Sequence, residues 1–129
     1  NIIENSLSNN VQYLGFHEKV DEYLERSSLF VLPSLYGEGS PTSILEAFTF
    51  SVPVVAYKID GIPELIEDGV DGLLFQPGNF KKLAKGIISL LSNPERIKVM
   101  GSSGKRKVEK HFVLGEMAKK HNVYFSRLK

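Results

Sequence analysis

Apolar residues along the chain fall into short runs that alternate with segments of helical period. Short apolar runs, which predict strands, lie at residues 11–14, 29–32, 52–57 and 73–75. Segments with apolar residues at helical spacing lie at residues 18–27, 42–50, 62–67, 79–91, 94–100 and 117–128. This alternation predicts a single α/β domain over residues 1–129, with a Rossmann-like parallel sheet of about four strands flanked by helices.

Composition narrows the function classes. Sixteen Lys and Arg against 15 Asp and Glu leave a net charge of +1, which gives no support for nucleic-acid binding. The chain has no Cys, so disulfides and thiolate metal sites are excluded. No apolar run reaches the roughly 18–20 residues that span a bilayer, and the polar N-terminus lacks the features of a signal peptide. His111 and His121 show no metal-ligand spacing, so we expect no metal site.

The loop that follows the run at 29–32 carries the most chemistry. It is rich in Gly, Pro and Ser, and it leads from a predicted buried strand into a helix, where α/β sheets bind nucleotides. Gly37 and Gly39 allow a close approach of backbone to ligand, and helix-start amides near Ser40–Ser43 favour a phosphate. The glycines could equally serve only a turn, and Pro41 only the helix start. Their spacing matches neither the dinucleotide fingerprint nor the P-loop.

Two glutamates frame this loop. Glu38 lies within it and Glu46 about one turn into the helix, so both could face one crevice and accept hydrogen bonds from vicinal sugar hydroxyls. Two simpler interpretations remain open. Ser43 and Glu46 have the spacing of a capping box, and Glu38 could be a solvated loop acid.

Two further features give weaker indications of a binding function. His17 follows the run at 11–14 and could contact a ligand, although a solvent-facing loop histidine is the simpler interpretation. The basic run Lys105–Lys107 is expected to be a solvated helix face, with a membrane-surface contact as the alternative.

Several ordered motifs resemble the C-terminal, nucleotide-sugar-binding domain of retaining group 1 glycosyltransferases, which have the GT-B fold. They are Val11–Gly15 (VQYLG), Pro33–Ser34, Glu38–Gly39 with Glu46–Ala47, Pro53–Val55, Gly61–Glu64 (GIPE) and Asp68–Leu74 (DGVDGLL). The resemblance runs continuously from about residue 10 to about residue 92. Ser51 departs mildly from the pattern, because the family often has Gly before the Pro-Val-Val strand.

The resemblance implies roles for these residues. Glu38 would lie near the donor sugar as the candidate catalytic residue, and Glu46 would bind the ribose hydroxyls. The backbone of the intervening segment would bind the diphosphate, and residues after the first strand would line the base pocket. The diphosphate-binding segment would comprise Gly39, Ser40, Pro41, Thr42 and Ser43. The residues of the base pocket would be Phe16 and His17.

The same resemblance implies a sugar transfer from a nucleotide-diphosphate-sugar donor, without a cofactor or required metal, in bacterial polysaccharide or lipopolysaccharide biosynthesis. We expect residues 1–129 to be a partial donor-binding domain that lacks its first strands and an N-terminal domain for a carbohydrate or lipid-linked acceptor. Alone it would be inactive and would tend to self-associate through its open sheet edge. The whole protein is expected in the cytoplasm, with a peripheral contact at the inner face of the membrane. The alternatives are a non-catalytic nucleotide-sugar-binding or assembly module and an unrelated α/β domain.

Overall fold

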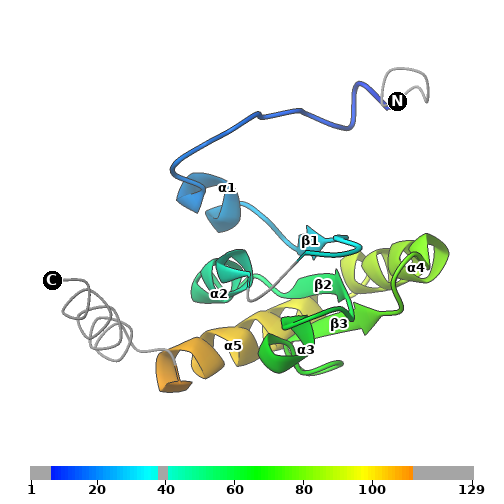
Figure 1. Cartoon of the computed structure of the whole chain (residues 1–129). Helices are drawn as coiled ribbons and strands as arrows, with labels where there is room; N and C mark the ends of the chain where they lie inside the picture. The colour runs from blue at the N-terminus through cyan, green and yellow to red at the C-terminus, as the bar shows by residue number, and fades with distance from the viewer. Residues whose placement is uncertain (1–6, 38–40, 112–129) are drawn as a thin grey trace, which may run out of the picture.

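A parallel sheet organises the computed structural model, which describes residues 7–37 and 41–111 (Figure 1). The elements in chain order are α1 (Asp21–Glu25), β1 (Phe30–Leu32), α2 (Thr42–Thr49), β2 (Val54–Tyr57), α3 (Ile62–Leu65), β3 (Gly72–Phe75), α4 (Phe80–Leu91) and α5 (Pro94–His111). The strands form one sheet in the order β1-β2-β3, and both pairings are parallel. The predicted α/β class with a parallel sheet is confirmed.

The central strand β2 is buried along its whole length. Val55 pairs with Val31 of β1 and with Leu73 of β3. The run of Val and Ala residues in β2 suits this position, because a parallel strand covered on both faces needs apolar residues at every site, without alternation. Consecutive side chains then enter two separate cores.

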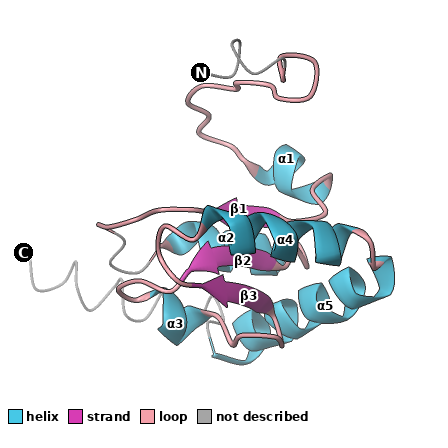
Figure 2. Ribbon diagram, turned by 90° about the vertical axis from the view of Figure 1, so that its right-hand side faces the viewer, coloured by secondary structure: helices cyan, strands magenta, loops and turns pink. Residues whose placement is uncertain are grey.

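Helices cover both faces of the sheet (Figure 2). On one face, Val54 and Ala56 join a cluster with residues of α1, α2 and α3, in which Phe48 is fully buried. On the other face, Val55 and Tyr57 join a cluster with residues of α4 and α5. The sheet therefore lies between two apolar layers, and its strand ends remain available for a site.

Helix α5 packs closely against α2 and the chain that follows it. A Cβ atom at Gly104 would overlap the Phe48 ring, and one at Gly101 would overlap the backbone carbonyl of Ser51. Both glycines are buried. They bring the helix closer than any side chain would allow.

Helix α2 ends in a Schellman motif. The amide of Val52 donates to Ala47 O at 2.9 Å, and that of Ser51 donates to Phe48 O at 3.0 Å. Ser51 has a φ of 58°, which is the left-handed conformation that this motif requires and that glycine adopts without strain.

The structure differs from the sequence prediction at residues 11–14, which form no strand. The amides of Asn10 and Val11 both donate to Leu7 O, and the side chain of Tyr13 is 90% exposed. A strand exists only when a neighbour pairs with its backbone, and none of the described strands does so. In both overall views this segment runs away from the sheet (Figures 1 and 2). The described part of the sheet thus has three strands, not about four.

Two other expectations concern a helix near the C-terminus and the absence of a membrane-spanning segment. The helix expected over 117–128 lies outside the described residues. Among the helices that the structure describes, none combines the length and apolarity needed to cross a membrane.

Candidate functional site at the carboxyl edge of the sheet

Three loops meet at the carboxyl edge of the sheet. Their described residues are 33–37 after β1, 58–61 after β2 and 76–79 after β3. Because neighbouring parallel strands lie about 4.8 Å apart, the starts of these loops lie side by side. This edge is where ligands bind in open α/β sheets.

Helix α2 begins at this edge. Its N-cap residue is Pro41, in extended conformation, and among the described residues no side-chain hydrogen bond to the helix start is formed by this N-cap residue. Ser43 therefore lies inside the first turn and not at the cap, so the capping-box interpretation of Ser43 and Glu46 is wrong. A first turn without a side-chain cap presents backbone amides and the positive end of the helix dipole, a combination that suits a phosphate.

Glu46 lies on the exposed side of α2. Thr42, Glu46 and Thr49 form a row at helical spacing that faces away from the core, while Ile44 and Phe48 are fully buried on the opposite side. Glu46 is one helical turn beyond Thr42, about 6 Å along the axis. Its carboxylate is therefore within reach of a ligand that contacts the helix start.

The loop after β1 is described as far as Gly37. Gly37 has a φ of 80°, so a turn here requires the freedom of glycine. Tyr36 next to it is 84% exposed, and the sequence pattern had not indicated it. Glu38, Gly39 and Ser40 lie outside the described residues.

Phe16 and His17 lie between the irregular segment and α1. The Phe16 side chain is 90% exposed. His17 Nε2 lies 2.8 Å from Leu14 O, and its ring meets the Tyr23 ring edge-on at 5.1 Å. These contacts are local and do not join His17 to α2. The simpler interpretation, an exposed loop histidine, fits them, and a role in a base pocket remains a prediction.

The loop after β2 contains a feature that sequence reasoning missed. Asp60 has a φ of 44°, which is a left-handed conformation in an aspartate. Ile62 N donates to Ile59 O at 3.0 Å, so residues 59–62 form a turn with Asp60 and Gly61 in its centre. The Asp-Gly dipeptide is a turn signal that could have drawn attention to it.

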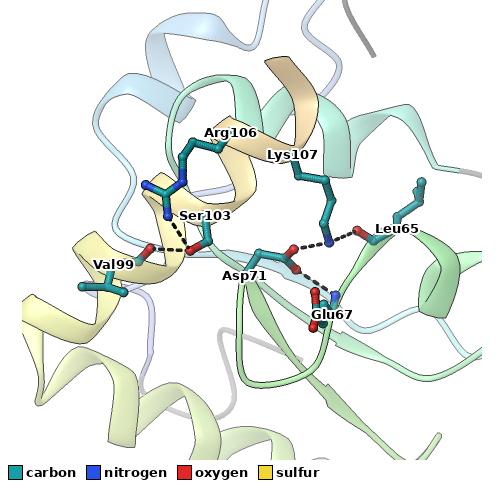
Figure 3. A network of polar contacts seen from close by, with 7 residues as sticks. All are labelled: Leu65, Glu67, Asp71, Val99, Ser103, Arg106 and Lys107. Atoms are coloured by element: carbon teal, nitrogen blue, oxygen red, sulfur yellow. Dashed lines mark hydrogen bonds and ion pairs between the residues drawn. The ribbon is translucent and has the colours of Figure 1, made fainter. Parts of the chain in front are cut away.

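A second missed feature is an ion pair at the opposite, amino edge of the sheet, where β3 begins. Asp71 is fully buried, and its Oδ2 pairs with the ammonium group of Lys107. Asp71 Oδ1 accepts from Glu67 N at 2.9 Å, and Lys107 Nζ donates to Leu65 O at 3.1 Å (Figure 3). Lys107 is therefore not part of a solvated basic face, in contrast to Lys105 and Arg106, which are exposed. The pair ties α5 to the turn that enters β3.

The described residues contain no cluster of three or more His, Cys, Asp or Glu side chains suited to hold a metal ion. The described part of this edge offers backbone amides, carboxylates, hydroxyls and an exposed tyrosine. These groups suit the recognition of a phosphorylated, hydroxyl-rich ligand.

Residues 2–107 match the family model for glycosyl transferases group 1. The chain is 39% identical over 105 residues to an exopolysaccharide phosphotransferase of Streptomyces coelicolor, an alignment that covers 74% of this chain and 11% of the relative. It is 33% identical over 118 residues to the amylovoran biosynthesis glycosyltransferase AmsK of Erwinia amylovora, covering 86% of this chain and 29% of AmsK. The chain therefore spans between about a tenth and a third of these relatives.

A solved structure agrees with this match. Anabaena HepE in complex with UDP-glucose superposes with a TM-score of 0.88 at 27% identity, over 98% of this chain and 35% of HepE. This agreement rules out an unrelated α/β domain with a chance pair of glutamates. From the family match and the structural likeness together, the chain belongs to the group 1 glycosyl transferases, as a partial C-terminal domain of their GT-B fold.

Proposed function

We propose that this chain supplies part of the donor site of an enzyme that transfers a sugar from a nucleoside-diphosphate sugar to an acceptor. One observation carries the proposal. The first turn of α2 opens at the carboxyl edge of the sheet with Pro41, which cannot cap it through its side chain, as N-cap residue, and the exposed Glu46 follows one turn later. In a group 1 glycosyl transferase, an anion site next to a carboxylate suits a diphosphate joined to a ribose.

The division of chemistry follows from the groups present. Backbone amides of Thr42 and Ser43 bind the diphosphate, whose charge rises as the sugar bond breaks, and the helix dipole stabilises that charge. The Glu46 carboxylate accepts hydrogen bonds from the two ribose hydroxyls. We assign to Glu38, which lies outside the described residues, the candidate catalytic role near the donor sugar that the family resemblance implies. We further propose that the configuration at the transferred sugar carbon is retained.

The acceptor belongs to a different part of the protein. We propose a carbohydrate or lipid-linked acceptor that is held by an N-terminal domain preceding this one, with a peripheral membrane contact at the inner face. Polysaccharide synthesis is the setting that the AmsK relative supports, since it is named for amylovoran biosynthesis. HepE, solved with UDP-glucose, supports a nucleotide-sugar donor.

A binding titration with two variants at one residue tests the donor site. The chain is titrated with UDP-, GDP- and ADP-sugars, followed by amide chemical shifts because a partial domain binds weakly. Glu46→Gln and Glu46→Ala should weaken the binding of one nucleotide class at least tenfold. Losing a hydrogen bond to a charged group costs roughly 1.5–3 kcal/mol, and 1.4 kcal/mol is tenfold.

A matched control is available in α1. Glu25→Ala also removes an exposed helical glutamate, but from the helix end that leads into the amino side of β1. It should leave the affinity within twofold of wild type. Affinity that is indifferent to Glu46, or absent for every donor, would contradict the proposal. Binding without transfer in the complete enzyme would favour a nucleotide-sugar-binding module.

A further inference from the structure

In the turn after β2, the residue with positive φ is Asp60, and not the glycine that follows it. Asp60, with φ 44°, and Gly61, with φ −79° and ψ −3°, occupy the two central positions of the turn that Ile62 N closes on Ile59 O. A positive φ at the first central position of a turn is the conformation that glycine adopts without steric cost. Here Asp60 holds the strained position, while Gly61 adopts angles open to any residue.

The only other described non-glycine residue with positive φ is Ser51. Its conformation follows from the Schellman motif that ends α2, and it lies before β2, toward the amino edge of the sheet. Asp60 lies beyond the opposite end of the same strand, at the edge where the donor site is proposed. Backbone strain in a non-glycine residue persists where the surroundings impose it, and it gathers at ligand sites.

The chemistry of Asp60 restricts what it could bind there. Its side chain is exposed at the edge where α2 begins and where the start of that helix favours a diphosphate. A carboxylate repels a diphosphate but accepts hydrogen bonds from hydroxyl groups. Leu32 of β1 pairs with Ala56 of β2, so the loops that follow begin about one strand spacing apart, roughly 4.8 Å. A hexose attached to a diphosphate at α2 would therefore lie within reach of the next loop.

We infer that Asp60 is a specificity-determining residue that accepts a hydrogen bond from a hydroxyl of the donor sugar. This inference rests on the proposed donor site and adds the group that selects the sugar, rather than the nucleotide. A consequence follows from the charge. Asp60 favours donors with neutral, hydroxyl-bearing sugars over donors whose sugar carries a carboxylate, such as UDP-glucuronic acid.

The test compares each nucleotide with its sugar conjugate. We titrate three proteins, the wild-type chain and its variants Asp60→Gly and Asp60→Asn, with UDP, UDP-glucose and UDP-glucuronic acid. If GDP or ADP binds more tightly than UDP, that nucleotide and its sugar conjugates are used instead. We expect both variants to bind the free nucleotide within twofold of wild type. Affinity for the neutral-sugar donor should fall about tenfold in Asp60→Gly. The preference for a neutral over an anionic sugar should shrink in both variants.

Thermal unfolding separates this role from a purely structural one. Asp60→Gly relieves the strained φ and should raise Tm by about 4 °C while it weakens sugar binding. Ser51→Gly is the matched control, because it relieves the other strained φ and should raise Tm without changing any affinity.

The outcomes distinguish the two claims. Normal nucleotide binding with a sugar contribution that is indifferent to Asp60 overturns the inference alone, as does a fall in Tm for Asp60→Gly. Failure of the wild-type chain to bind any free nucleotide overturns the proposed donor site together with the inference.

Discussion

Asp71 and Lys107 form an ion pair between the turn that enters β3 and the second half of α5. The Asp71 carboxylate is fully buried, while the Lys107 side chain is 23% exposed. The pair is joined to the backbone on both sides, through Glu67 N and Leu65 O. It therefore holds the segment 65–71, which connects α3 to β3, against α5.

Removing the lysine should destabilise the domain, because it leaves the Asp71 carboxylate buried without its partner. We expect Lys107→Met to lower the free energy of unfolding by about 2 kcal/mol, less than for a fully buried pair because Lys107 is partly solvated. Urea unfolding measures the change. Lys105→Met, an exposed neighbour, should cost less than about 0.5 kcal/mol. The double variant Asp71→Asn/Lys107→Met should recover part of the loss, and equal losses at Lys105 and Lys107 would disprove the role of the pair.

The close approach of α5 to α2 predicts an unusual effect of alanine. Replacing an exposed helical glycine with alanine stabilises a protein by roughly 0.5–1 kcal/mol. Gly104→Ala should instead destabilise by about 1–3 kcal/mol, because the new methyl group would overlap the Phe48 ring. Thermal or urea unfolding measures the sign. In the background Phe48→Leu, which makes room beside the helix, the same change should cost clearly less. A stabilising Gly104→Ala would show that the helices are not packed this closely.

The side chain of Asn93 caps the N-terminus of α5, and its contribution to stability can be tested. Asn93 Oδ1 accepts from Arg96 N at 3.1 Å, as the Asn-Pro dipeptide predicts. Asn93→Ala should lower the free energy of unfolding by about 1 kcal/mol, since the first-turn amide loses its acceptor. Asn93→Asp keeps an acceptor and should be close to neutral in the same urea series. Equal costs for the two variants would contradict a capping role.

Local patterns in the sequence predicted most of the fold. The helical periodicity of residues 79–91 is a strong signal because it shows which face of that helix is buried. The Val-rich run of β2 is a strong signal because it shows that both faces of the strand are buried. The run at 11–14 has the same local character, but a strand depends on a partner elsewhere in space. Periodicity cannot supply that partner, so the strand prediction failed.

The site was predictable in part for the same reason. The topology placed the loop after β1 and the start of α2 at the ligand edge. Glu46 lies on the exposed side of its helix, and its contact with a donor stays a prediction. Two other features could not be read from local pattern. The strain at Asp60 depends on a turn whose strained position holds aspartate while the glycine follows it. The burial of Lys107 depends on Asp71, which lies far away in the sequence.

The most direct test of the central claim is a map of backbone amide shifts during titration with UDP and UDP-glucose, with the GDP and ADP pairs in parallel. The account predicts saturable changes that concentrate at the carboxyl edge of the sheet, at Thr42, Ser43 and Glu46, with those at Asp60 appearing only with the sugar attached. Saturable changes elsewhere, for example along α5 or around His17 and Tyr23 alone, would contradict a donor site at this edge. So would the absence of any saturable change with all three nucleotides.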